Sequence, residues 1–300
     1  MVWLIGNRGL LGREVEGLLR RDAAEYIVSD AEVDITDRDA LASFGAHHRK
    51  SSQNIDWIIN CAAYTAVDRA EDEPAAAGRL NALGPKNLAR LADDLGAALV
   101  HISTDYVFDG QKAEGYREED SPGPRSVYGR SKWAGEVAVA RFCRRHYILR
   151  TAWMFGRYGR SFVTAMLERF EQGESVQVVD DQWGSPTNAA DLAAAINRLI
   201  SAQPQAPFGI YHFTNRGVVS WYEFAREIHS QASALGLCPP TSTISPVSSE
   251  AYPSRAARPA YSILHTEKIS AALKLQIDPC FVALHRYLSS LIESSQRRMS

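Results

Sequence analysis

The first 21 residues place a glycine-rich turn between a short apolar run and a segment with helical periodicity. Residues 2–5 are typical of a buried strand, and Gly6, Gly9 and Gly12 follow them at intervals of three. Residues 13–21 carry apolar side chains on one side of a helix. This order of strand, tight turn and helix begins a dinucleotide-binding unit, so it predicts an α/β protein; a plain glycine turn is the alternative.

Each glycine of this turn has a steric role in that interpretation. Gly6 permits the tight turn, Gly9 lets a pyrophosphate approach the backbone, and Gly12 lets the helix pack against the strand. The first N–H groups of the helix have no partner within it, so they are expected to face the phosphates of the cofactor.

The residues that could select the cofactor give opposing signals. A second apolar run over residues 26–29 ends at Ser29, and Asp30 follows it. An acid at this point binds the adenosine ribose of NAD, whereas a nearby arginine accepts the extra phosphate of NADP. Because Arg8 lies within the glycine turn, the sequence favours NADPH and leaves NADH open.

Apolar runs then alternate with helical segments. The runs over residues 55–60, 98–102 and 147–150 predict a doubly wound parallel (Rossmann) sheet within residues 1–150. Beyond that point the pattern loosens, and we expect a smaller C-terminal α/β part, mainly substrate-binding, over residues 151–300. Residues 184–215 are expected to return to the cofactor-binding part.

Two further segments lack a clear pattern. Residues 239–259 are rich in proline and serine and predict a loop. Residues 293–300 are expected to fray at the end of the chain.

Polar residues follow the apolar run over residues 98–102. Thr104 and Asp105 come where ligands gather in a parallel sheet, at the carboxyl end of a strand. Further on, Tyr128 and Lys132 lie on one face of a predicted helix. A nearby ammonium lowers the pKa of a phenol, ordinarily about 10, and suits it to moving a proton at a carbonyl oxygen. An exposed helical face is the alternative.

Composition excludes several classes of protein. The formal net charge of −2 over 300 residues gives no basic field for nucleic acid. No window reaches the roughly 18 apolar residues that a membrane helix needs, and the N-terminus shows no leader. The four cysteines form no CxxC pair, which favours reduced thiols in a cytoplasmic protein.

Four motifs in order resemble those of the extended short-chain dehydrogenase/reductases: Gly6-x-x-Gly9-x-x-Gly12, Asn60–Thr65, Ser103–Phe108 and Tyr128-x-x-x-Lys132. Four narrower stretches resemble the dTDP-4-dehydrorhamnose reductase family: Thr65–Asp68 with Ala70-Glu71, Thr151–Trp153, Asp181–Thr187, and Arg258-Pro259 followed by Ser262. Together the two sets span nearly the whole chain.

This resemblance implies reduction of the C4 ketone of dTDP-4-dehydro-6-deoxy-L-mannose to dTDP-L-rhamnose by NAD(P)H, in the synthesis of cell-surface polysaccharide. The expected partner is therefore a dTDP-linked 4-keto-6-deoxyhexose, with no nucleic acid and no membrane, and the protein is expected to be a monomer or a homodimer. Some relatives hold Mg²⁺ with carboxylates at a dimer contact. Glu14 stands where one such carboxylate could be, but the set is incomplete, so Mg²⁺ stays open and no metal site is predicted.

The resemblance also assigns roles to residues. Tyr128 would donate a proton to the developing alkoxide, Lys132 would lower the Tyr128 pKa and hold the nicotinamide ribose, and Thr104 would hydrogen-bond the same oxygen. Asp105 would bind a sugar hydroxyl and Trp153 would border the hexose. Arg258 would bind the diphosphate. With the glycine turn, the expected cofactor residues are Gly6, Arg8, Gly9, Leu10, Leu11, Gly12, Ser29, Asp30, Asp34, Ile35, Ala62, Ala63, Tyr64, Thr65, Tyr128 and Lys132.

Two rival functions remain on the sequence alone. A nucleotide-sugar epimerase or dehydratase of the same superfamily would reuse the hydride, but a dehydratase needs an Asp-Glu pair where this chain has Asp105 and Tyr106. A non-catalytic regulatory relative would not need Thr104, Tyr128 and Lys132 together. Trp183 and Trp221 are interpreted as core aromatics, and His101 as a satisfied core histidine.

Overall fold

The computed structural model describes residues 1–49, 54–201, 206–252 and 254–299. Its centre is a sheet of six parallel strands in the order β10-β5-β4-β3-β1-β2. The strands are β1 (Val2–Ile5), β2 (Tyr26–Ser29), β3 (Trp57–Asn60), β4 (Ala98–Thr104), β5 (His146–Thr151) and β10 (Gly209–His212). The chain runs outward from β1 to β2 and then returns to the other side of β1, which confirms the predicted doubly wound sheet.

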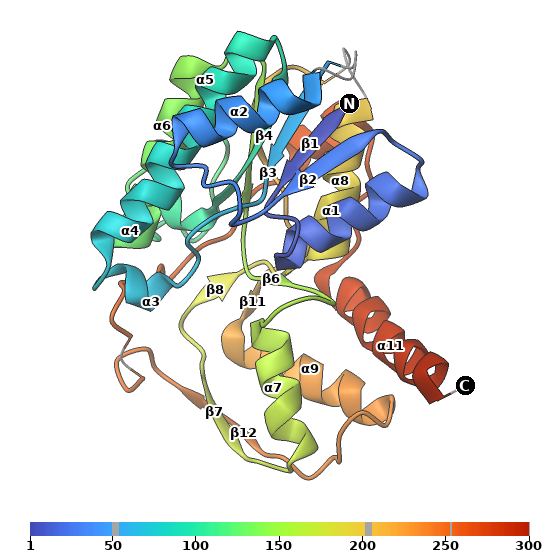
Figure 1. Cartoon of the computed structure of the whole chain (residues 1–300). Coiled ribbons are helices and arrows are strands. Elements are labelled where there is room, and N and C mark those ends of the chain that lie inside the picture. The colour runs from blue at the N-terminus through green and yellow to red at the C-terminus, as the bar shows by residue number, and fades with distance from the viewer. Residues whose placement is uncertain (50–53, 202–205, 253, 300) are drawn as a thin grey trace.

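Helices cover both faces of this sheet (Figure 1). Side chains alternate along each strand, so Leu4 packs with one layer of helices and Trp3 with the other. The first layer holds α1 (Leu10–Arg21), α8 (Ala189–Ser201) and α10 (Glu267–Leu273). The second holds α2 (Arg38–Arg49), α5 (Gly84–Leu95) and α6 (Val127–Phe142). Strand β10, from the stretch expected to return, pairs with β5.

A separate hydrophobic core lies below the carboxyl ends of the strands in Figure 1. It gathers Phe170, Phe224 and Leu284 from α7 (Phe162–Glu171), α9 (Trp221–Ala234) and α11 (Cys280–Met299). Beside it β7 (Val176–Val179) pairs with β12 (Ile244–Val247). Two short pairs join the halves, β6 (Met154–Phe155) with β9 (Thr187–Asn188) and β8 (Trp183–Gly184) with β11 (Val219–Ser220).

Two expectations for this half were wrong in part. Strand β12 lies within residues 239–259, which we predicted to be a loop, because backbone pairing with β7 supplies an order that the Pro- and Ser-rich sequence does not signal. The backbone of α11 continues to Met299, through the tail expected to fray.

The segment between β3 and α5 is only partly α-helical. Short helices α3 (Val67–Ala70) and α4 (Pro74–Gly78) lead into a π-helical turn, η1 (Arg79–Leu83), before α5 begins. Inside η1 the buried Asn81 side chain accepts a hydrogen bond from the Tyr64 N–H, and its amide donates to the Tyr64 carbonyl oxygen and to the Ser131 hydroxyl. These bonds tie the segment after β3 to α6.

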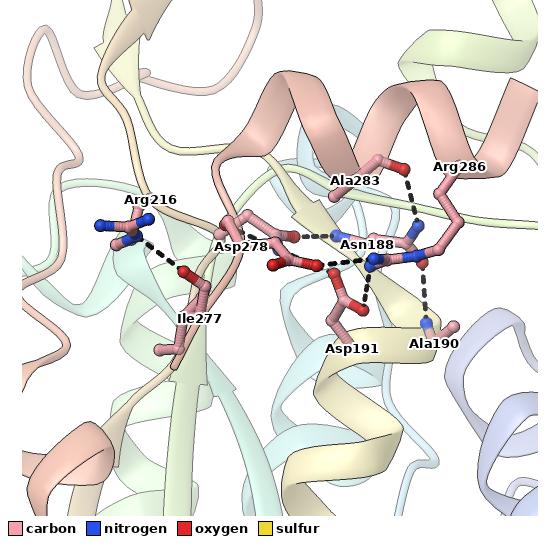
Figure 2. A network of polar contacts seen from close by, with 9 residues as sticks. Asn188, Ala190, Asp191, Arg216, Ile277, Asp278, Ala283 and Arg286 are labelled. Atoms are coloured by element: carbon pink, nitrogen blue, oxygen red, sulfur yellow. Dashed lines mark hydrogen bonds and ion pairs between the residues drawn. The ribbon is translucent and has the colours of Figure 1, made fainter. Parts of the chain in front are cut away.

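Figure 2 shows a polar network that fastens α11 to the first turn of α8. Arg286 on α11 donates to Asp191 on α8 and, at 2.6 Å, to Asp278. The Asn188 amide donates to the Ala283 carbonyl oxygen at 3.2 Å. The network therefore holds the last helix against the half of the molecule that carries the sheet.

All four cysteines carry free thiols. Within the described ranges, no helix has both the length and the apolar character needed to span a bilayer.

Candidate active site

A cavity of about 840 Å³ opens at the carboxyl ends of β1 to β5, where the chain reverses direction across the sheet. Most residues singled out from the sequence line it together. They are Gly6, Arg8, Gly9, Leu10, Leu11, Asp30, Asp34, Ile35, Ala62, Ala63, Thr65, Thr104, Asp105, Tyr128, Lys132 and Trp153.

The glycine turn has the geometry that a dinucleotide needs. Gly6 has a φ of +78°, and a Cβ there would lie 2.6 Å from the Ala62 nitrogen. A Cβ on Gly12 would lie 2.1 Å from the Gly6 carbonyl oxygen, so glycine lets α1 approach the turn. Helix α1 has no side-chain cap, and its first N–H groups, at Leu10 and Leu11, stand at the cavity. A pyrophosphate fits this cradle.

The adenosine end of the cavity holds opposing charges at its rim. The Arg8 N–H donates to the Asp30 carboxylate at 3.0 Å, and the exposed Arg8 guanidinium lies 3.4 Å from Glu32. Ser29 is fully buried and accepts a hydrogen bond from the Trp3 indole at 2.9 Å. Its hydroxyl is directed to the packing of the sheet and the cavity lining begins at Asp30, so a contact between Ser29 and the cofactor stays a prediction.

The segment after β3 contributes its small residues rather than its aromatic one. Ala62, Ala63 and Thr65 line the cavity. Tyr64 does not, because its hydroxyl donates to Glu73 at 2.8 Å and its backbone is held by Asn81. Asn81 was missed by the sequence analysis, and a buried amide inside an otherwise apolar helical pattern was the available signal.

Helix α6 delivers Tyr128 to the cavity floor. The Ser126 hydroxyl caps the helix by accepting from the Gly129 N–H at 3.0 Å, and a Cβ on Gly129 would lie 2.2 Å from the Tyr106 carbonyl oxygen. Burial raises the pKa of Tyr128 above the ordinary phenol value, and hydrogen bonding with Thr104 opposes that rise. The expected lowering is therefore reversed, because burial desolvates the phenolate, and the phenol is protonated at neutral pH.

Lys132 is buried one turn beyond Tyr128. Its Nζ donates to the Ile102 carbonyl oxygen at 2.6 Å. Burial lowers the Lys132 pKa to about 8, and the charge of Glu136 opposes that shift. Glu136 is itself paired with the buried Arg150, 2.7 Å away. The sequence analysis missed this ion pair, which spacing along one element cannot reveal.

Asp105 lies at the end of β4, in the short 3₁₀ helix η2 (Asp105–Val107). The Thr104 hydroxyl donates to Asp105 Oδ1 at 2.8 Å. Burial raises the pKa of the Asp105 carboxyl to about 6, and the Thr104 hydrogen bond opposes the rise. Asp105 Oδ2 is buried with no hydrogen-bond partner in the part of the chain that the structure describes.

Two stacked indoles form the far wall of the cavity. The rings of Trp153 and Trp221 are 3.4 Å apart and nearly parallel. Trp153 has a φ of +47°, and a Cβ on Gly184 would lie 2.6 Å from its ring, so the glycine leaves room for the indole. Trp221, interpreted from the sequence as a core aromatic, lines the cavity as well as touching the core.

Arg258 stands outside the set of residues that line the cavity. Its guanidinium donates to the Asp68 carboxylate at 2.7 Å. A hydrogen bond from Arg258 also reaches the Tyr106 phenol, which does line the cavity. In the structure Arg258 is therefore paired with an acid, and its contact with the diphosphate stays a prediction.

The described residues offer no cluster of three or more His, Cys, Asp or Glu side chains placed to hold a metal ion. Glu14 is half-buried, and burial raises its pKa while Arg157 opposes the rise.

This geometry can support one kind of chemistry well. A protonated phenol, a hydroxyl and an ammonium converge beside small residues at which a flat ring can lie. Such donors stabilise an oxygen that gains negative charge, so the site suits the reduction of a carbonyl.

Comparison with known proteins agrees with this chemistry. The chain matches the family model described as RmlD substrate binding domain over residues 1–292. It is 43% identical over 275 residues to the dTDP-4-dehydrorhamnose reductase of Streptomyces griseus, which covers 90% of this chain and 87% of that protein. It is 41% identical over 268 residues to a probable dTDP-4,6-dihydroxy-2-methyloxan-3-one 4-ketoreductase of Streptomyces antibioticus, covering 88% and 86%.

A solved structure extends the likeness to three dimensions. The dTDP-4-dehydrorhamnose reductase of Bacillus anthracis, in complex with NADP, matches with a TM-score of 0.88 and 37% identity, covering 96% of this chain and 98% of that one.

Proposed function

Because the chain belongs to the RmlD substrate binding domain family, we propose that it reduces the C4 ketone of dTDP-4-dehydro-6-deoxy-L-mannose to dTDP-L-rhamnose with NAD(P)H. The observation that carries this proposal is the meeting of Thr104, Tyr128 and Lys132 with a dinucleotide-type glycine turn in one cavity. The product would enter the synthesis of cell-surface polysaccharide.

The chain's own residues then divide the reaction between them. When bound, a reduced nicotinamide supplies the hydride that adds to C4. Tyr128 gives its proton to the C4 oxygen, and the raised pKa of the phenol keeps that proton in place until it is needed. Thr104 donates to the same oxygen, and Lys132 holds the ribose beside it. A fixed donor at this oxygen is typically worth roughly 10²–10³-fold in rate.

The hexose and the diphosphate of the substrate contact different residues. Trp153 borders the hexose, with Trp221 stacked behind it, and Asp105 Oδ2 accepts from a sugar hydroxyl. Arg258 serves the diphosphate only after exchanging its bond with Asp68 for one with the phosphate oxygens.

We propose NADPH as the preferred cofactor, because Arg8 lines the adenosine end and the B. anthracis relative was solved with NADP. The Asp30 carboxylate accepts from the Arg8 backbone and leaves the guanidinium to a weak pair with exposed Glu32. Arg8→Ala is expected to raise KM for NADPH several-fold more than KM for NADH, since one guanidinium–phosphate contact is lost. Arg13→Ala, on the exposed side of α1, is the matched control. Equal losses for the two cofactors in Arg8→Ala would exclude this reading of Arg8.

We further propose that residues 1–150 bind the cofactor together with residues 184–215, and that residues 151–300 mainly bind the substrate. β10 and α8 support this division, since both pack with the sheet. We place the protein in the cytoplasm, where both of its substrates would be found.

The direct test follows nicotinamide absorbance. Purified protein is mixed with NADPH or NADH, with and without dTDP-4-dehydro-6-deoxy-L-mannose. We expect rapid loss of absorbance that depends on the sugar, with one dTDP-L-rhamnose formed per cofactor oxidised. A protein that binds NADPH but leaves the absorbance unchanged would contradict the proposal and favour an isomerising or regulatory relative.

A further inference from the structure

The Thr104 hydroxyl has one proton, and two acceptors compete for it. In the structure the proton is directed at Asp105 Oδ1, 2.8 Å away. In the proposed reaction the same proton must point at the C4 oxygen as negative charge develops there. One hydroxyl proton cannot serve both acceptors fully, so the state of Asp105 decides where Thr104 donates.

Protonation of Asp105 would reverse this bond. A neutral carboxyl has one O–H donor, and Thr104 Oγ1 lies within reach to accept it. The Thr104 proton would then be released toward the cavity, on the side where the Tyr128 phenol lies. No bond to carbon is formed or broken at Asp105, and its proton is not consumed.

We propose that Asp105 is a positioning residue: when it is protonated, it turns the Thr104 hydroxyl from the carboxylate toward the substrate's carbonyl oxygen. This inference rests on the proposed reduction and adds a pH-controlled step to it.

The surroundings of Asp105 favour protonation of its carboxylate. The residue is 3% exposed, and its Oδ2 has no hydrogen-bond partner among the described residues. The Ser262 hydroxyl donates to the Trp183 carbonyl oxygen at 3.4 Å, and its interaction with the Asp105 carboxyl opposes part of the rise in pKa. An ionised carboxylate is therefore poorly solvated here, and burial raises its pKa to about 6.

Among the side chains that oppose the raised pKa of Asp105, Thr104 acts most strongly and Ser262 comes second. From η2 and α6, the phenols of Tyr106 and Tyr128 face Asp105, and burial raises both of their pKa values, that of Tyr106 to about 12. On the late segment Arg258 interacts with Tyr106 and is paired with Asp68. Lys132 directs its Nζ at the Ile102 carbonyl oxygen.

The first test needs no substrate. Protein labelled with ¹³C at aspartate Cγ is titrated from pH 4 to 9, and Asp105 is assigned by the signal lost in Asp105→Asn. We expect a midpoint near 6, in line with the raised pKa, moving up by roughly one pH unit in Thr104→Val because the carboxylate loses a donor. A midpoint near 4, or one that Thr104→Val does not move, overturns the inference.

The second test is the pH profile of kcat. In the wild type, kcat should fall roughly tenfold per pH unit above the Asp105 midpoint, because the ionised carboxylate holds the Thr104 proton. The amide introduced by Asp105→Asn donates to Thr104 at every pH, so this limb of the profile, the fall in kcat above pH 6, should vanish. A limb caused by Lys132, whose pKa lies near 8, should remain. Asp109→Asn, outside the cavity lining, is the control that keeps both limbs.

The outcomes separate the two proposals. If Asp105 acts only by binding a sugar hydroxyl, Asp105→Asn raises KM and keeps the limb, which overturns the inference while the reductase stands. If the wild type turns over no 4-keto sugar, the proposed function fails, and the titration with Thr104→Val still decides whether the two side chains are coupled.

Discussion

At the scale of single residues, the proposed reaction depends most on Tyr128 as its proton donor. Tyr128→Phe removes the proton donor but keeps the ring that packs edge-on against Tyr106. We expect the variant to fold, to bind NADPH and to lose roughly 10²–10⁴-fold in kcat. Stopped-flow absorbance with saturating sugar measures this loss. Tyr116→Phe, outside the cavity lining, should keep turnover within a few-fold. Near-normal kcat in Tyr128→Phe would remove its role as the donor.

Asp105 also makes a prediction about stability. Its folded-state pKa, about 6, lies above the ordinary 3.8, so its ionisation costs stability as pH rises through that window. Asp105→Asn should therefore be more stable than the wild type by about 3 kcal/mol at pH 8 and nearly equal to it at pH 4, as measured by urea unfolding.

Asp120→Asn is a matched variant whose stability should change with pH in the opposite direction. The Asp120 carboxylate accepts from Lys112 and from the Arg117 N–H, and these hydrogen bonds lower its pKa. Asp120→Asn should lose stability above pH 4 rather than gain it. Asp105→Asn that shows the same stability difference at pH 4 and pH 8 would contradict the buried-carboxylate argument.

Single residues also show where sequence alone succeeds and where it cannot. The sequence singled out Gly6, Tyr128 and Lys132 by their local spacing, and the structure places all three in one cavity. The partners of Ser29 and Arg258 could not be predicted because they are distant in sequence: Trp3 lies on a neighbouring strand, and Asp68 is 190 positions away from Arg258. His101 is half-satisfied, since Asn60 meets one ring nitrogen and the other has no partner among the described residues.

At the scale of elements, α6 is shaped by close approach rather than by a hydrophobic stripe. A Cβ on Gly135 would lie 2.1 Å from the Asn81 carbonyl oxygen in η1. Gly135→Ala should cost about 1–3 kcal/mol, although alanine favours a helix, because backbone must move to admit the methyl group. Gly17→Ala, on α1 with open space around it, should instead stabilise by about 0.5–1 kcal/mol.

Thermal unfolding of both variants tests this comparison. Gains of similar size for Gly135→Ala and Gly17→Ala would show that η1 can yield without cost. A loss confined to Gly135→Ala should also reduce kcat, because the same helix carries Tyr128 and Lys132.

Elements with a strong period were predictable within a few residues. Strands β1 to β5 coincide with the apolar runs that the sequence displays. The π-helical turn η1 and the strand β12 were not predicted, because each depends on a partner elsewhere in the chain: Tyr64 and Ser131 for η1, and β7 for β12.

At the scale of the whole molecule, the network in Figure 2 makes α11 part of the sheet-bearing half. Arg286→Gln leaves the largely buried carboxylate of Asp191 without its cation, while the Asn215 amide still donates to it. We expect a loss of about 1–2 kcal/mol in the free energy of unfolding, measured by urea. Arg38→Gln, whose partner Asp94 is equally exposed and 3.9 Å away, should change it by less than about 0.5 kcal/mol. Equal losses of unfolding free energy in Arg286→Gln and Arg38→Gln would show that the network stabilises the protein no more than an exposed ion pair does.

The doubly wound parallel sheet was predicted from the sequence, because apolar runs that alternate with helical segments leave few other topologies. The arrangement of the second core did not follow, since α7, α9 and α11 come from distant stretches and meet only in three dimensions.

The stacked indoles of Trp153 and Trp221 connect the two halves and form a coupled pair of chromophores. Trp153 follows the end of β5, whereas Trp221 begins α9 in the second core. Two chromophores 3.4 Å apart and nearly parallel share their excited states, so their circular dichroism is that of a coupled pair rather than of two single tryptophans. The stacked pair therefore acts as an intrinsic spectroscopic probe. A rotation of one half against the other changes the angle between the two rings, and so changes the circular dichroism spectrum without an added label.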